Sequence, residues 1–308
     1  MKLLLACLIF AIHGSFAQNL IDPECMKFLP HGSSSKIYGG TSTDLLRNPW
    51  MVQILQIGYH MCGGSLITSQ FVLTAAHCKS NYPMKVRLGG CKGGKPKYEC
   101  TSEYCNLIST EIDVAMMFSH PQYNEYHEYD IALILMAESV LYNGKAYNYK
   151  VNVRVFSLNY SFSAQIRPIC LMKGTDIDSQ WRFLKYVETF NVTGWGKTEW
   201  GENSNELQLA NLYQLDKDHC SQLFRRNIDM PHICAGQSKA STCIGDSGGP
   251  LSAVMTFSDM ARPFLFGLTS YGAPGCRAAT VFTNVLSYSD WIEYIVENHT
   301  PRTALLRV

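Results

Sequence analysis

Apolar residues occur along most of this chain in short runs rather than at helical spacing. The runs are rich in β-branched and aromatic residues, and Gly, Asn, Asp or Pro bounds most of them, as is typical of β-strands. The clearest are WMVQIL at 50–55, GSLIT at 64–68, FVLTA at 71–75, KVRLGG at 85–90, DIALILM at 130–136 and FLFGLTSYG at 264–272. Many short strands in succession predict an all-β sandwich or barrel.

Helical spacing of apolar residues is confined to the end of the chain. In SYSDWIEYIVENH, at 287–299, apolar residues recur at roughly helical intervals. Ser289 stands at the position of a residue that caps the N-terminus of a helix. We therefore expect one C-terminal helix beside the strands.

The first 17 residues have the features of a secretory signal peptide. Lys2 precedes the apolar run LLLACLIFAI, and Ser15 and Ala17 place small residues at positions −3 and −1 of a cut after Ala17. A membrane anchor is the alternative, but the run is too short to span a bilayer, and no other segment is apolar for long enough. We expect a secreted, extracellular protein with no membrane partner.

Composition and charge indicate which classes of partner the protein is expected to have. Of the 308 residues, 46% are hydrophobic and 17% are charged, which is typical of a globular chain with one large or two small domains. The formal net charge is +1, and the chain contains no long basic or acidic run. We therefore expect neither nucleic acid nor an anionic membrane surface as a partner.

The chain contains 12 cysteines, which in a secreted protein predict disulfide bonds. Cys7 lies in the signal peptide, so an odd number remains after its removal. At least one thiol then has no partner within the chain.

The segment NGKAYNYKVNVRVFSLNYSFSA, residues 143–164, does not fit the strand pattern. It has no apolar face of its own and is long for a connection between strands. Two interpretations are open. The segment is a surface insertion, or it is a retained intron, because Gly144-Lys145 and Phe162–Ala164 can be encoded by splice donor and acceptor sequences. Sequencing the spliced messenger decides between them.

Three short motifs follow one another in the order His, Asp, Ser. LTAAHC contains His77, DIALI begins with Asp130, and GDSGGP contains Ser247. A serine hydroxyl is a poor nucleophile unless a base lies within hydrogen-bond reach, and that base needs a carboxylate to fix its tautomer. Gly245 and the glycines after Ser247 permit a tight turn whose backbone N–H groups can face an oxyanion. Together the motifs predict nucleophilic catalysis by serine.

Further motifs extend this set: IYGG at 37–40, NPWMV at 48–52, CGGSLI at 62–67, RPICL at 167–171, GWGKT at 194–198, SYG at 270–272 and VFTNV at 281–285. The chain resembles the chymotrypsin/trypsin family of serine proteases, most of all the secreted insect type, from Ile37 to about Asn298 apart from 143–164. The resemblance implies an all-β fold of two antiparallel six-stranded β-barrels with a C-terminal helix, and a catalytic site in the cleft between the barrels.

The resemblance also implies a role for each motif residue. His77 matches the general base, Asp130 the carboxylate that orients it, and Ser247 the nucleophile. The N–H groups of Gly245 and Ser247 match the oxyanion hole. Ser270 matches the serine that hydrogen-bonds near the buried aspartate and lines the substrate strand. No cofactor is implied, and we expect no metal, because the loop GCKGGKPKYEC carries lysines where calcium-binding relatives have acidic residues.

SSSKIYGG resembles a zymogen cleavage site. Cleavage after Lys36 would free the α-amino group of Ile37, and in this family that group pairs with the aspartate before the nucleophile, here Asp246. The expected organisation is a signal peptide at 1–17, a prosegment at 18–36, a protease domain at 37–299 and a C-terminal tail at 300–308.

By the same resemblance, four pairs of cysteines are expected to form disulfides: Cys25–Cys170, Cys62–Cys78, Cys220–Cys234 and Cys243–Cys276. The first would keep the prosegment attached after cleavage. Cys100 and Cys105 are close enough in sequence to close a small loop. Cys91 is then the odd residue, either buried and inert or paired with another chain.

Ser241 stands six residues before Ser247, where trypsin-like relatives have an aspartate that selects Lys or Arg. Without that carboxylate, a Lys or Arg side chain would be buried unpaired. Gly272 matches an open pocket wall, and Thr280 narrows the opposite wall. With Thr242 and Ser270, these residues predict a shallow apolar pocket for small or medium aliphatic side chains. A chymotrypsin-like pocket for larger apolar residues is the alternative.

An enzyme whose pocket rejects Lys does not readily cut its own activation site after Lys36. We therefore expect a separate trypsin-like activating protease.

Three N-glycosylation sequons begin at Asn159, Asn191 and Asn298. We expect Asn298, near the end of the domain, to be used. Asn191 lies in a strand that leads to GWG, and Asn159 belongs to the 143–164 segment.

The leading hypothesis is an active serine endopeptidase with protein or peptide substrates, an upstream activating protease and a serpin-type inhibitor as partners. The alternative is a catalytically weak or inactive homologue that acts as a binding or regulatory protein. The triad is complete, but Thr280, Gly90, Cys91 and the 143–164 segment indicate relaxed constraint. A lipase or esterase is disfavoured, because α/β-hydrolases have their catalytic residues in a different order.

Overall fold

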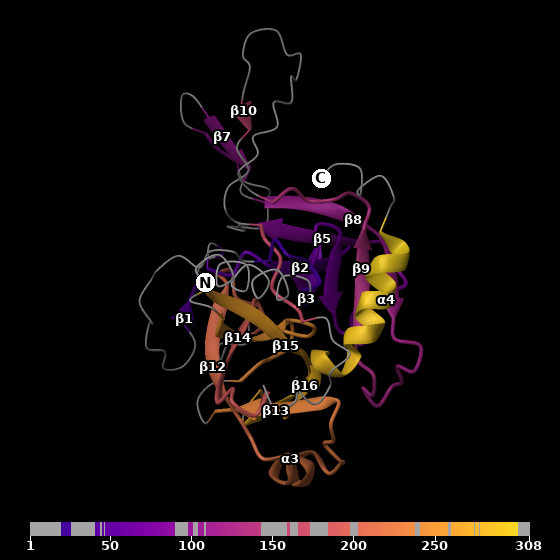
Figure 1. Cartoon of the computed structure of the whole chain (residues 1–308), viewed down its shortest axis with the longest axis vertical. Coiled ribbons are helices and arrows are strands. Elements are labelled where there is room, and N and C mark those ends of the chain that lie inside the picture. The colour runs from indigo at the N-terminus through magenta and orange to yellow at the C-terminus, as the bar shows by residue number, and fades with distance from the viewer. Residues whose placement is uncertain are drawn as a thin grey trace, which may run out of the picture.

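The computed structural model shows two β-barrels and a C-terminal helix (Figure 1). The described residues are 20–25, 41–43, 45, 47–89, 98–100, 104–107, 109–142, 159–160, 166–172, 184–197, 203–237, 241–257, 260–273, 275–276 and 278–300. No helix within these ranges is long and apolar enough to cross a membrane. The predicted signal peptide, Lys36, Ile37 and Cys91 lie outside them, so the expectations for these residues stay predictions.

The first barrel is a closed antiparallel sheet of six strands in the order β2-β3-β4-β9-β8-β5. The strands are β2 (Met51–Gln56), β3 (Tyr59–Leu66), β4 (Phe71–Thr74), β5 (Met84–Gly89), β8 (Ser109–Ser119) and β9 (Ala132–Met136). The apolar run of β4 is buried on both faces. Val72 packs inside this barrel, whereas Phe71 and Leu73 pack in a cluster shared by both barrels. The two buried faces explain why this run is continuous rather than alternating.

The second barrel has six strands in the order β12-β11-β14-β15-β16-β13, and the pairing of β12 with β13 closes it. The strands are β11 (Thr189–Gly194), β12 (Gln208–Gln214), β13 (His232–Gly236), β14 (Pro250–Phe257), β15 (Met260–Gly272) and β16 (Ala279–Asn284), and β1 (Thr41–Ser42) pairs with the outer edge of β12. Phe190, Phe266 and Phe282 fill its core, the first two in edge contact at 5.7 Å. The prediction of two six-stranded antiparallel barrels is therefore confirmed.

The predicted C-terminal helix is α4 (Ser289–His299), and it follows directly from a 3-10 helix, η2 (Val285–Tyr288). The predicted cap at Ser289 is wrong, because Ser289 is the first residue of α4 and Tyr288 caps it without a side-chain hydrogen bond. Instead, Asn284 Oδ1 accepts a hydrogen bond from Leu286 N (3.1 Å) at the start of η2. The polar cap therefore comes one helical segment earlier in the chain.

A second helix, α3 (Lys217–Phe224), was not predicted. Its start is capped by Asp216, whose side chain accepts from Asp218 N and His219 N. Cys220 is its one buried residue and is bonded to Cys234 of β13. A helix held by a cap and a disulfide needs no apolar stripe, and for this reason the hydrophobic pattern did not reveal it.

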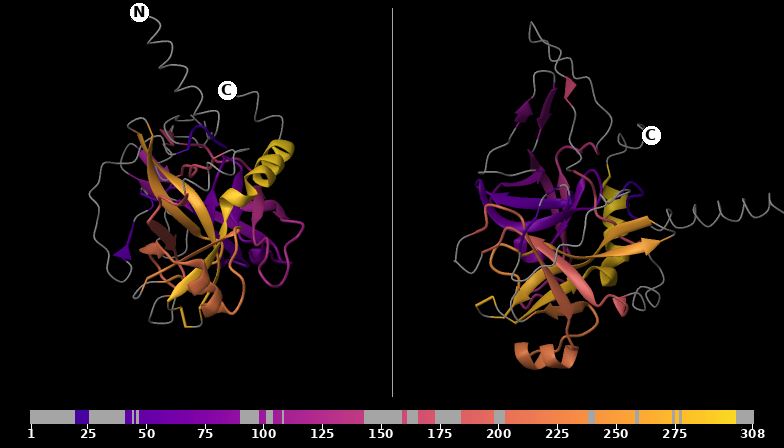
Figure 2. Two further views of the ribbon diagram at one scale, coloured as in Figure 1. Left: turned by 60° about the horizontal axis from the view of Figure 1, so that its bottom comes forward. Right: turned by 90° about the vertical axis from the view of Figure 1, so that its left-hand side faces the viewer.

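A small three-stranded sheet consists of β6 (Tyr98–Cys100), β7 (Tyr104–Leu107) and β10 (Asn159–Tyr160). Figures 1 and 2 show it at the end of the molecule opposite α3. β10 belongs to the 143–164 segment and runs parallel to β7. The other residues of that segment lie outside the described ranges, so its origin stays open.

Residues 20–25, from the predicted prosegment, pack against the body of the protein. Leu20 and Cys25 are buried, and Cys25 forms a disulfide with Cys170. The Tyr142 hydroxyl donates a hydrogen bond to Asp22 Oδ2 (2.6 Å). A cut after residue 36 would therefore leave this segment covalently attached.

We predict that Leu133→Ala lowers the free energy of unfolding by about 3 kcal/mol, because it removes buried methyl groups and leaves a cavity. Leu133 is fully buried in the cluster shared by the two barrels. Chemical denaturation with intact disulfides measures the change. Leu223→Ala on α3 is the matched control, because Leu223 is 42% exposed. Equal losses in the two variants would contradict this account of the core.

Candidate active site

His77 and Asp130 are brought together by the pairing of two strands. His77 lies in a short 3-10 helix, η1 (Ala76–Cys78), just after β4, and Asp130 lies just before β9, which pairs with β4. His77 Nδ1 is 2.7 Å from Asp130 Oδ2, and His77 N donates to Asp130 Oδ1 at 2.9 Å. An ionised carboxylate only accepts, so Nδ1 carries the proton and Nε2 of the neutral ring is free to accept one.

The Asp130 side chain is fully buried, and four donors surround its carboxylate. Besides the two from His77, Ser270 Oγ donates to Oδ2, and His127 Nδ1 lies 3.2 Å from the same oxygen. Burial alone raises the pKa of this carboxyl, but hydrogen bonds from His127, His77 and Ser270 outweigh burial and hold the pKa well below its usual range. Asp130 is therefore an anion at neutral pH.

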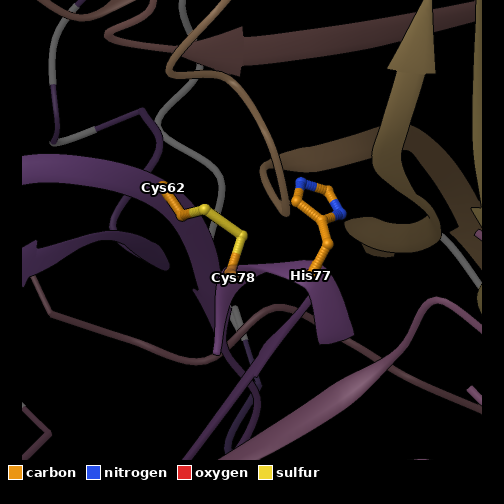
Figure 3. A group of neighbouring side chains, drawn as sticks. All are labelled: Cys62, His77 and Cys78. Atoms are coloured by element: carbon orange, nitrogen blue, oxygen red, sulfur yellow. A yellow bond between two sulfur atoms is a disulfide. The ribbon is translucent and has the colours of Figure 1, made fainter. Parts of the chain in front are cut away.

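A disulfide fixes the segment that carries His77. Cys62 of β3 is bonded to Cys78, the residue after His77, and Figure 3 shows the bond beside the imidazole ring. These two sulfurs lie near the ring, but sulfurs joined in a disulfide are not thiolates and do not offer metal ligands. The role of this group is structural.

The backbone of Ser247 is held between the two barrels. Gly63 of β3 donates N–H to the Ser247 carbonyl (2.8 Å), and Gly248 N donates to Thr269 O of β15 (2.8 Å). Gly248 has φ +73°, and a Cβ there would lie 2.1 Å from Thr74 Oγ1, so only glycine fits. The same Cβ would lie 2.9 Å from Ala75 N, which places this turn beside the segment that carries His77.

Among the described residues, no hydrogen bond joins the Ser247 hydroxyl to the His77 ring. The structure therefore brings Ser247 to the same junction as His77 and Asp130. Of the three side chains, those of His77 and Asp130 are hydrogen-bonded to each other. Such bonds are often long before substrate binds, and this geometry does not remove Ser247 as a nucleophile.

Asp246 points into a site lined by backbone. Its carboxylate accepts from Gly196 N (2.8 Å) and Cys243 N (2.9 Å), and a Cβ on Gly196 would lie 2.5 Å from the carboxylate oxygens. Burial raises the pKa of Asp246 to about 6, although the two N–H donors oppose this shift. Within the described part of the chain, these two N–H groups are its only partners, so a buried cation would relieve the cost of its charge.

Gly245, the first predicted oxyanion-hole residue, has φ +98°, and its carbonyl accepts a hydrogen bond from His60 Nε2 (2.9 Å). Burial lowers the pKa of His60 despite this bond, so its ring is neutral at pH 7 with the proton on Nε2. His60 fixes the orientation of the peptide that follows Gly245. Sequence analysis missed it, and its one signal is its place two residues before Cys62.

The predicted pocket residues meet through their hydroxyl groups. Thr280 Oγ1 lies 2.8 Å from Thr242 Oγ1 and 3.2 Å from Ser241 Oγ. Gly272 is the cross-strand partner of Thr280, and a Cβ on Gly272 would lie 3.5 Å from the Thr280 hydroxyl. Thr280 is fully buried between these residues. Its side chain therefore occupies space that glycine at this position would leave open.

The remaining predicted residues are the cysteines and the asparagines of the glycosylation sequons. The structure contains the disulfides Cys25–Cys170, Cys62–Cys78, Cys220–Cys234 and Cys243–Cys276, and Cys100 and Cys105 face each other as backbone partners of β6 and β7. Of the sequons, Asn298 is exposed on α4, Asn191 is half-buried in β11, and Asn159 is in β10.

His127 is a second residue that sequence analysis missed. Its ring stands edge-on to the His77 ring at 5.1 Å and lies 5.5 Å from the Tyr271 ring. The signal in the sequence is the histidine three residues before Asp130. It carries no family motif, so only the folded chain reveals that it shares the carboxylate with His77.

Comparisons with known proteins agree with the fold. A family model described as Trypsin matches residues 37–292. The serine protease grass of Drosophila melanogaster is 29% identical over 305 residues, which are 91% of this chain and 72% of that protein. The CLIP domain-containing serine protease B4 of Anopheles gambiae is 31% identical over 282 residues, 84% of this chain and 70% of that protein. The crystal structure of the Drosophila Grass clip serine protease of the Toll pathway matches with a TM-score of 0.69 and 27% identity, over 89% of this chain and 76% of that one.

We predict that Asp246 destabilises the intact chain as pH rises. Its pKa is about 6 in the folded chain against 3.8 for the free side chain, so the folded state binds more protons between these values. The contribution of Asp246 to the free energy of unfolding is therefore fully present below the unfolded pKa of 3.8. It is lost as pH rises through the folded pKa of about 6, and the loss reaches about 3 kcal/mol.

Denaturation of the intact chain and of Asp246→Asn from pH 4 to pH 7 measures this effect. The variant should gain about 2.4 kcal/mol relative to the parent across that range. Asp113→Asn is the control, because the Asp113 side chain is 70% exposed and should show no such trend. Parallel pH profiles for Asp246→Asn and the parent would disprove the prediction.

Proposed function

Because the chain belongs to the trypsin family of serine proteases, we propose that it is a secreted endopeptidase that uses His77, Asp130 and Ser247. The observation that carries this proposal is the pair of hydrogen bonds from His77 to the buried Asp130, which leaves His77 Nε2 free as a base. The fixed backbone of Ser247 at the junction of the barrels supports it.

In the proposed reaction, His77 Nε2 takes the hydroxyl proton of Ser247 as Ser247 Oγ bonds to the carbonyl carbon of the substrate. The Asp130 anion stabilises the imidazolium that forms. The N–H groups of Gly245 and Ser247 receive the oxyanion. His77 then gives the proton to the leaving amine as the C–N bond breaks, and water releases the acyl group from Ser247 by the same steps in reverse order.

We propose that the chain is made as a zymogen and cut after Lys36. The new ammonium group of Ile37 would pair with Asp246, whose carboxylate has only two backbone N–H partners among the described residues. This ion pair would relieve the cost of the buried charge and order the neighbouring turn at Gly245. The predicted signal peptide at 1–17 supports an extracellular location.

The proposed pocket accepts small or medium apolar side chains at the residue before the cut. Ser241 places a hydroxyl where a carboxylate would select Lys or Arg, and Thr280 fills space beside Gly272. Burying an unpaired Lys or Arg there would cost several kcal/mol. The enzyme would then depend on a separate trypsin-like protease for the cut after Lys36.

We predict that the purified chain, once cut after Lys36 by an added trypsin-like protease, cleaves a peptide library after Ala, Val or Leu. The added protease is removed first, and Ser247→Ala supplies the blank. Cleavage after Lys or Arg would overturn the pocket. No cleavage above the blank would overturn the proposed activity and favour a binding or regulatory homologue.

Thr280→Gly tests the pocket wall directly. It should raise the ratio of kcat/KM for Phe or Leu substrates over Ala substrates by about tenfold or more, because it opens space for a larger side chain. Thr280→Val is the matched control: it keeps the size of the side chain and removes its hydroxyl. An equal shift in both variants would show that the hydroxyl, and not the volume, sets the preference.

A further inference from the structure

We propose that His77, His127 and Asp130 form a binding site for a divalent transition-metal ion such as Zn²⁺, and that the bound ion switches the protease off. The inhibition rests on the proposed peptidase function, whereas the metal site does not. The proposal also revises the expectation that this chain binds no metal, which was drawn from the lysine-rich loop alone.

The ligand atoms already lie close together. One atom from each of the three residues lies within 4.8 Å of the other two. Zn²⁺ binds nitrogen and oxygen at about 2.0–2.2 Å, so two ligand atoms at a tetrahedral angle lie about 3.3 Å apart. His127 Nδ1 and Asp130 Oδ2 are separated by 3.2 Å, which is already this spacing. On binding, the ion would replace the proton between these two atoms, and the proton would pass to solvent. His77 Nδ1 lies 2.7 Å from the same oxygen, which is closer than this spacing, so the His77 ring would have to turn away from Asp130 to join the set.

Solvent exposure lets an ion reach the site from one side. The Asp130 side chain is fully buried, whereas those of His77 and His127 are 20% and 33% exposed. An ion would therefore approach from the side of the two imidazoles and meet an anionic carboxylate beneath them. A fixed negative charge in a partly desolvated site favours a cation.

The loop before Asp130 holds His127 in place for this role. Asn124 O accepts from His127 N (3.1 Å), and Asn124 Oδ1 accepts from Tyr126 N (3.0 Å) and Glu128 N (3.3 Å). His127 has φ +59°, in the left-handed region that few non-glycine residues adopt. With Tyr271 against its ring, His127 is a pre-positioned ligand rather than a mobile surface residue.

The chemistry of the ligands selects the metal. Imidazole nitrogens suit Zn²⁺, Cu²⁺ and Ni²⁺, whereas Ca²⁺ and Mg²⁺ prefer oxygen ligands. An ion bound to His77 would prevent this ring from accepting the Ser247 proton. The site therefore predicts reversible inhibition by Zn²⁺ and none by Ca²⁺ or Mg²⁺ at the same concentration.

The binding experiment uses the full cleaved chain carrying Ser247→Ala, so that it needs no activity and no autolysis occurs. Calorimetric titration with Zn²⁺ should show a site whose affinity falls at least about tenfold when His127→Asn is added. Asparagine is chosen because it also tolerates a positive φ and keeps a donor near Asp130. His219→Gln is the control, because it removes an exposed histidine on α3 and should leave this affinity unchanged.

The second arm measures peptide cleavage by the cleaved, active chain, each variant relative to its own zinc-free rate. Zn²⁺ should inhibit the parent and the His219→Gln variant, and removal of the ion by EDTA should restore their activity. The His127→Asn variant should need at least about tenfold more Zn²⁺ for half inhibition. Equal zinc affinity with and without His127 would overturn the site. Zinc binding that depends on His127 in a chain without peptidase activity would uphold the site and overturn the proposed function.

Discussion

The buried carboxylate of Asp130 is the constraint on which the rest of the site depends. A charge with no exposure to water is stable only if donors surround it. The first barrel and the loop before β9 supply His77 and His127, and the second barrel supplies Ser270 Oγ and the Thr283 hydroxyl, which donates to the Asp130 carbonyl. Because neither barrel supplies the whole set, docking of the barrels and ionisation of Asp130 are coupled.

The same junction positions the other reacting groups. The carbonyl of Ser247 is bonded to β3, and the N–H of Gly248 is bonded to β15, so both barrels fix the turn that presents the serine. The Cys62–Cys78 disulfide fixes the segment with His77 on the other side. The site therefore owes its geometry to strands, a disulfide and backbone hydrogen bonds, which suits chemistry that depends on accurate positions.

The sequence predicted those strands and catalytic residues that apolar runs or short motifs mark. The apolar runs of β2, β4 and β9 located the strands, and the motifs named His77, Asp130 and Ser247. Contacts of residues outside the motifs could not be predicted this way. His127 and His60 carry no motif, and only the fold reveals that they contact Asp130 and Gly245. The same limit explains the missed helix α3, which depends on a cap and a disulfide, and the misplaced cap at Ser289.

The most direct test of this account is the rate at which a fluorophosphonate labels Ser247 in the cleaved chain and in its Asp130→Asn variant. The amide keeps the size of the side chain but removes the charge that holds the proton on His77 Nδ1. The account predicts that labelling slows by about a thousandfold or more, because His77 can no longer act as the base in the correct tautomer. Labelling of the variant at the parent rate would contradict the claim that the buried Asp130 anion organises this site.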